Sequence, residues 1–104
     1  MTQGERDEHL ILPDQVGIEN REEIRQAAEE RLAAMPEGEG VLILDLSGTE
    51  YIDTAGLGLL AMVHRLAAER HHVVRLRNPN EEIRFSLVLA RLDDLFELEP
   101  AAVD

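Results

Sequence analysis

Short apolar runs alternate along the chain with stretches whose apolar residues recur every three or four positions. Residues 9–12 form a short apolar run, and residues 16–18 form a second short extended piece. A first helix is expected after Asn20, because Asn20 and Glu23 have the spacing of a capping box, and it should end before Pro36. Its apolar positions are Ile24, Ala27, Ala28, Leu32 and Met35.

The most apolar run, residues 41–44, is continuous rather than alternating. Such a run is typical of a central strand that is covered on both faces. A turn at 47–48 and a short piece ending at Ile52 follow it, and a second helix is expected to open at Asp53 and Thr54. The apolar stripe predicted for this helix consists of Leu57, Leu60, Ala61, His64, Ala67 and Ala68.

Residues 73–77 have the pattern of a further strand, and residues 78–80 should start a third helix. A turn at 93–94 and an edge strand within 95–98 complete the pattern. Strands that alternate with helices predict an α/β fold, with a mixed, largely parallel sheet packed against helices. The positions of the third helix expected to face inward are Ile83, Leu87 and Ala90.

Length and composition favour one soluble domain. With 104 residues the chain can bury a core without metals or disulfides, and it contains no cysteine. We expect the domain to span residues 9–99, with flexible ends at 1–8 and 100–104. The N-terminus does not have the pattern of a signal peptide, and no apolar run approaches the ~20 residues that span a bilayer. These features predict a cytoplasmic protein without membrane insertion.

The net charge of −12 argues against nucleic acid or an anionic membrane as a partner. The four histidines lack metal-ligand spacing, and His64 is the one expected to be partly buried. Asp45 and Asp53 flank one turn, but no nucleophile or base of another type accompanies them. Asp45 is better suited to holding the turn through backbone N–H groups. We therefore predict no catalytic residues, no metal, no cofactor and no enzymatic activity.

The start of the second helix is the most informative segment. In open α/β sheets functional groups gather at the carboxyl ends of strands, and a helix N-terminus tolerates a carboxylate or phosphate. The hydroxyl of Thr54 would lie there, and Gly56 and Gly58 would leave room for a ligand or another backbone. Asp53 and Thr54 also suit a structural N-cap, and the glycines can simply relieve packing. On spacing alone both interpretations stand.

The residues from Val41 to Leu60 carry a family resemblance. The run Val-Leu-Ile-Leu-Asp-Leu-Ser, followed by Tyr-Ile-Asp-Thr-Ala-Gly-Leu-Gly-Leu-Leu, resembles the signature of STAS domains. The likeness continues through residues 73–76, through Asn78-Pro79, and into Leu-Asp-Asp-Leu-Phe at 92–96. It covers about residues 10 to 99. The resemblance implies the STAS fold and a regulatory role.

Bacterial anti-sigma factor antagonists are the relatives that the chain resembles. In them the hydroxyl residue after the aspartate is phosphorylated by the partner, a kinase-type anti-sigma factor of the ATPase class. The resemblance thus implies that Thr54 is the phosphoacceptor and that a protein partner docks at Asp53, Thr54, Ala55, Gly56, Leu57 and Gly58. Phosphate would add about −1.5 to −2 charge beside Asp53, Glu50 and Asp45 and repel an acidic partner.

A second function stays open. Asp-Thr-Ala-Gly forms also resemble STAS proteins linked to chemotaxis and the STAS subunit of lipid-transporting ABC transporters. The alternative is therefore a non-switching subunit that stabilises an ATPase partner. The sequence leaves the oligomeric state open, including a homodimer.

Overall fold

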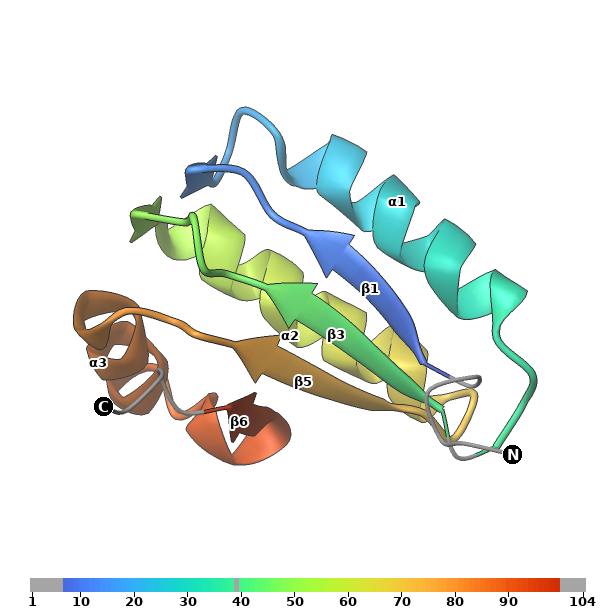
Figure 1. Cartoon of the computed structure of the whole chain (residues 1–104). Coiled ribbons are helices and arrows are strands. Elements are labelled where there is room, and N and C mark those ends of the chain that lie inside the picture. The colour runs from blue at the N-terminus through green and yellow to red at the C-terminus, as the bar shows by residue number, and fades with distance from the viewer. Residues whose placement is uncertain (1–6, 39, 100–104) are drawn as a thin grey trace.

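Four parallel strands form the main sheet of the computed structural model, which describes residues 7–38 and 40–99 (Figure 1). Their order across the sheet is β1 (Glu8–Ile11), β3 (Val41–Asp45), β5 (Val73–Arg77) and β6 (Glu97–Glu99). A smaller parallel pair joins β2 (Gln15–Val16) to β4 (Tyr51–Ile52). The helices are α1 (Arg21–Ala34), α2 (Thr54–Ala68), α3 (Glu81–Leu89) and the short 3₁₀ helix η2 (Asp93–Leu95).

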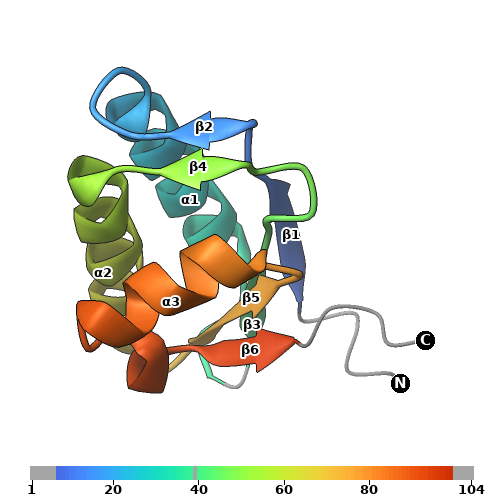
Figure 2. The same ribbon diagram turned by 90° about the vertical axis from the view of Figure 1, so that its left-hand side faces the viewer.

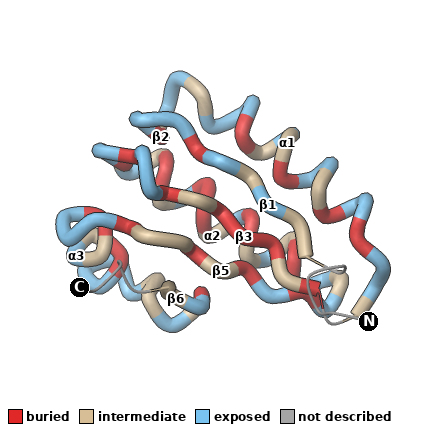
Figure 3. The backbone as a smooth tube through the Cα atoms, viewed as in Figure 1, coloured by how far each residue is buried: buried red, intermediate tan, exposed pale blue. Residues whose placement is uncertain are grey.

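The core lies between the main sheet and the pair α1 and α2. These helices pack on each other, α1 contacts β1 and α2 contacts β5 (Figure 1). Because side chains alternate along a strand, Leu42 and Leu44 of β3 face this core, together with their neighbours in register on β5, Val74 and Leu76. All four are buried. Figure 3 shows buried positions along the central strand β3. β3 is thus the central strand that its apolar run predicted.

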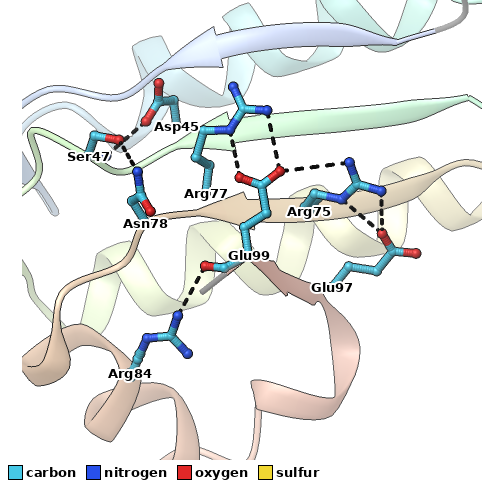
Figure 4. Close-up of polar contacts among 8 residues, drawn as sticks. All are labelled: Asp45, Ser47, Arg75, Arg77, Asn78, Arg84, Glu97 and Glu99. Atoms are coloured by element: carbon cyan, nitrogen blue, oxygen red, sulfur yellow. Dashed lines mark hydrogen bonds and ion pairs between the residues drawn. The ribbon is translucent and has the colours of Figure 1, made fainter. Parts of the chain in front are cut away.

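Ion pairs cover much of the opposite sheet face at the β5–β6 edge (Figure 4). Arg75 pairs with Glu97 at 2.9 Å. Arg77 binds both carboxylate oxygens of Glu99, at 2.8 and 3.3 Å, which lowers the pKa of Glu99 and raises that of Arg77. Arg84 of α3 donates to the backbone oxygen of Glu99 at 3.0 Å. These bonds attach the short edge strand β6 to both its neighbour and α3.

The predicted fold class is confirmed, and every strand pair described is parallel. The strands, helices and their order also match the pattern of the sequence. β1 begins at Glu8, one residue before the predicted domain. The predicted flexible ends otherwise lie mainly outside the described residues, at 1–6 and 100–104.

Three local predictions were wrong. The side chain of Asn20 does not cap α1: it accepts from the backbone N–H of Gly17 at 3.0 Å and donates to the carbonyl of Gln15 at 2.7 Å. Ala90 is exposed because α3 ends at Leu89. The buried stripe of α2 is turned relative to the prediction, leaving Ala68 exposed; its buried members are Gly56, Leu59, Leu60, Val63 and Ala67.

Candidate functional site

Helix α2 begins at Thr54 because Asp53 caps it. Asp53 has extended backbone angles, φ −89° and ψ −177°, and its Oδ1 accepts from the backbone N–H of Gly56 at 2.8 Å. This is the usual geometry in which an aspartate satisfies a free N–H of the first helical turn. Asp53 therefore acts as the structural N-cap that its position in the sequence suggested.

Asp53 also ties the start of α2 to the loop after β2. Its Oδ2 accepts from the backbone N–H of Ile18 at 3.2 Å, and its own N–H donates to the carbonyl of Val16 at 3.1 Å. The N–H of Gly56, and next that of Ile18, hold the pKa of Asp53 below its usual value because they stabilise the charged carboxylate. A fixed negative charge thus lies next to Thr54.

Thr54 itself is exposed, and its hydroxyl forms no hydrogen bond with any of the described residues. Since Asp53 supplies the cap, the fold does not require this hydroxyl. Thr54 is the first residue of α2, where the unpaired N–H groups and the helix dipole favour negative charge. A phosphate attached here would be compatible with the helix.

The two glycines of the predicted docking turn occupy different environments. Gly56 is buried, and a Cβ there would lie 2.4 Å from the carbonyl oxygen of Val16 and 2.7 Å from Cγ2 of Ile52. Gly56 therefore lets β2 pack closely against α2. Gly58 is exposed and a Cβ there would meet nothing within 4 Å. Of these two glycines, Gly58 is the one that leaves space for a partner at the surface.

The other members of the predicted docking segment are half-buried. Leu57 packs against the core from its edge, and Ala55 has intermediate exposure. The structure thus brings Thr54 and Gly58 to the surface, with Ala55 and Leu57 partly accessible and Gly56 below them. The segment is one continuous helix start, but its six residues do not contribute equally to the surface.

An acidic hollow of about 370 Å³ adjoins Asp53. Asp14 and Glu19 line it together with Asp53, and the exposed side chains of Ile18 and Tyr51 border it. These residues were missed from sequence because the pairing of β2 with β4 brings residues 14–19 beside residue 51. The available signal was the pair of large apolar side chains, Ile18 and Tyr51, within polar segments.

A second groove lies between α1 and α2. It has a volume of about 560 Å³, with Leu59 and Met62 as its apolar residues, and Gly58 leaves its α2 side open. Arg21 lines the same groove and lies near enough to Asp53 to contribute to lowering its pKa. Arg25 also lines it but pairs with Glu29 at 2.8 Å and with Glu22.

Asp45 is engaged away from the α2 start. Its Oδ1 accepts from the N–H of Ser47 at 2.9 Å, so it holds the turn as predicted (Figure 4). The hydrogen bond from the side chain of Ser47 is the main cause that lowers the pKa of Asp45, and Arg77 adds to the effect. Asn78 donates to Ser47 Oγ at 3.0 Å, which fixes the turn further.

The histidines form no metal site in the part of the chain that the structure describes, where no group of three or more His, Cys, Asp or Glu residues is arranged to hold a metal ion. His64 is half-buried, as predicted, and its ring meets that of Phe96 edge to face at 5.9 Å. His72 is more deeply buried than predicted, and neither ring nitrogen has a hydrogen-bond partner among the described residues. Among those residues, no helix has the length and apolar character needed to cross a bilayer.

Comparison with known proteins gives a consistent result. The family model described as "Mlab, STAS domain" matches residues 2–99. No curated protein matches the chain in sequence. Similar solved structures include a Thermotoga maritima protein described as an anti-sigma factor antagonist, which is 22% identical with a TM-score of 0.73 and covers 89% of this chain and 80% of its own.

Two further structures have the same fold. An anti-sigma-factor antagonist (STAS) domain protein from Planctomyces limnophilus is 14% identical with a TM-score of 0.77, covering 90% of this chain and 82% of its own. The murine Solute Carrier 26 family member A9 anion transporter is 17% identical with a TM-score of 0.78; the match covers 93% of this chain but only 16% of the transporter. At these identities the likeness concerns the fold.

Proposed function

The chain belongs to the STAS domain family, and we propose that it is a non-enzymatic switch that docks a protein partner at the start of α2 and is controlled by phosphorylation of Thr54. The partner is an anti-sigma factor or a serine/threonine kinase of the ATPase type. The unmodified form binds this partner in the cytoplasm, and the phosphorylated form releases it. The docking unit spans residues 9–99.

The observation that carries this proposal is the free hydroxyl of Thr54. It is exposed at a helix N-terminus, while the neighbouring Asp53 performs the capping. A residue that the fold needed for its cap would be a poor modification site, because its hydroxyl would be occupied. Thr54 is free to accept a phosphate or to contact a partner, and the dipole of α2 would stabilise the modified form.

Charge around Thr54 supports release after modification. A phosphate adds about −1.5 to −2 charge to a surface where Asp53, Asp14 and Glu19 already lie close together. Arg21 partly offsets this charge. The net effect repels a partner whose contact surface is acidic, and salt should weaken that repulsion.

A second candidate function is favoured by the description of the matching family model, "Mlab, STAS domain". In this case the chain is a non-switching subunit of a transporter or chemotaxis-linked complex and stabilises an ATPase partner through the same helix. The two functions differ in the role of Thr54. A scaffold binds its partner through the shape of the docking surface, so a charge at Thr54 should weaken its binding less than it weakens that of a switch.

Affinity capture from the source cells tests the proposal. Wild-type protein and a Thr54→Glu variant serve as baits, with Thr54→Gln as the neutral control of similar size. We expect the wild type and Thr54→Gln to retain the same partner and Thr54→Glu to lose it. When wild-type protein is then incubated with that partner and ATP, we expect phosphate on Thr54, as detected by mass spectrometry. Equal retention of an ABC-type ATPase by all three baits would instead support the scaffold function.

A further inference from the structure

A strip of exposed apolar residues runs along α3, away from the core. Phe85, Val88 and Leu89 are 61%, 54% and 68% exposed. Their spacing of three and four residues places them on one face of the helix, while Ile83 and Leu87 are buried on the other. Figure 2 shows α3 at the outside of the molecule, below β4. The helix is thus apolar on two faces, and only the face with Ile83 and Leu87 is covered by the core.

Two hollows that share Glu82 extend the surface beside α3 to β4. A hollow of about 590 Å³ beside α3 is lined by Glu82, Phe85 and Val88, among others. A smaller hollow between α3 and β4 shares Glu82 and is also lined by Tyr51, which is 54% exposed. We call the set Tyr51, Glu81, Glu82, Phe85, Val88 and Leu89 the α3 strip. Neighbouring exposed apolar residues such as Phe85, Val88 and Leu89 commonly mark an interaction site.

The free charge on the strip is negative. Glu81 and Glu82 are exposed and form no ion pair among the described residues. The one basic residue of α3, Arg84, also lines the hollow beside α3, and its guanidinium donates to the backbone carbonyls of Pro79 and Glu99, at 3.3 and 3.0 Å. Two carboxylates thus face one cation, so the net charge here is negative. A complementary partner would therefore present basic residues beside apolar ones.

We propose that the α3 strip is a second docking surface, which binds a basic amphipathic helix of a partner protein. The apolar residues of such a helix would cover Phe85, Val88 and Leu89, and its Lys or Arg residues would face Glu81 and Glu82. A second copy of this chain fits less well, because each chain carries a net charge of −12 and two such strips would bring carboxylates together. This inference rests on the proposed function only in taking the protein to be one that binds other proteins, since Thr54 is not part of the strip.

A designed peptide tests this surface directly. The probe is a helix of about 14 residues made of Leu and Lys with helical apolar spacing. Its control has the same composition in an order that destroys the spacing. In amide NMR spectra of the full chain we expect the helical peptide to shift the signals of Glu82, Phe85, Val88 and Leu89. By calorimetry, Phe85→Ser should weaken binding by about tenfold.

Ile11→Ser is the matched variant, because Ile11 is also apolar and 77% exposed but lies on β1. It should bind the peptide like the wild type, and so should Thr54→Glu. Equal binding of the two peptides, shifts confined to other surfaces, or no effect of Phe85→Ser would overturn the proposal. A wild-type dimer that Phe85→Ser converts to monomer in sedimentation would show that a second copy is the occupant instead. If Thr54→Glu still retains the captured partner, in contrast, that result contradicts only the proposed switch.

Discussion

Replacing each glycine of α2 with alanine should change stability in opposite directions. By helix propensity alone, either substitution would stabilise the helix by about 1 kcal/mol. At Gly58 nothing lies within 4 Å of the added Cβ, so we expect a gain approaching that value. At Gly56 the Cβ would lie 2.4 Å from the carbonyl oxygen of Val16, well inside van der Waals contact.

The clash at Gly56 should outweigh the propensity. Adding a methyl to a packed site costs about 1–3 kcal/mol. The contacting atom here belongs to the backbone of β2, which cannot rotate away as a side chain can, so the upper end applies. After the gain of about 1 kcal/mol from propensity, Gly56→Ala should lose about 2 kcal/mol. For a domain of this size that loss corresponds to roughly 10 °C in Tm.

Urea denaturation of the wild type and both variants measures these changes through the midpoint and slope. Amide NMR spectra of Gly56→Ala should show the largest displacements around Val16 and Ile52, if the variant remains folded. Gly56→Ala as stable as the wild type would refute the close packing of β2 on α2. Gly58→Ala less stable than the wild type would refute the open environment assigned to Gly58.

Three other predictions concern single residues of the described structure. Thr54→Ala should change stability by less than about 0.5 kcal/mol in urea denaturation, because Asp53 rather than Thr54 caps α2; a loss of several times that value would make Thr54 structural. The depressed pKa of Asp53 means that its contribution to stability is complete above the unfolded value of about 3.9 and is lost as pH falls through the folded value. The stability difference between wild type and Asp53→Asn should therefore shift against the wild type between about pH 5 and pH 2, and a constant difference would contradict the assignment. His72→Leu should raise the free energy of unfolding by about 1 kcal/mol, and with it the urea midpoint, because it removes two buried nitrogens without partners. A lower midpoint would show that the ring nitrogens do have hydrogen-bond partners.

The elements could be predicted from sequence because local signals define them. A continuous apolar run indicated β3, and the strand pattern of residues 73–77 indicated β5. Asp53 and the segment 78–80 indicated two helix starts, where the side chains of Asp53 and Asn80 each accept a backbone N–H. Asn20 has the same signal, yet its side chain binds the loop before α1 instead. An asparagine can bond in either direction, and only the folded loop decides which one is used.

The helix start that carries the candidate site was predictable from sequence, but the environment of its residues was not. The start at Asp53 and Thr54 was expected, yet nothing local distinguishes Gly56 from Gly58. The difference arises because β2 passes over Gly56, and a pairing as short as β2 with β4 leaves little trace in sequence. The acidic hollow formed with Asp14 and Glu19 was missed for the same reason. Such contacts join residues more than thirty positions apart.

The central claim is that charge at Thr54 controls docking at the start of α2. Calorimetric titration of the captured partner with wild type, Thr54→Gln and Thr54→Glu, each at low and high salt, tests it most directly. Thr54→Gln should bind like the wild type, whereas Thr54→Glu should bind about tenfold more weakly at low salt and recover partly at high salt. If Thr54→Glu binds as tightly as the wild type at both salt concentrations, phosphate repulsion at this site is not the switch.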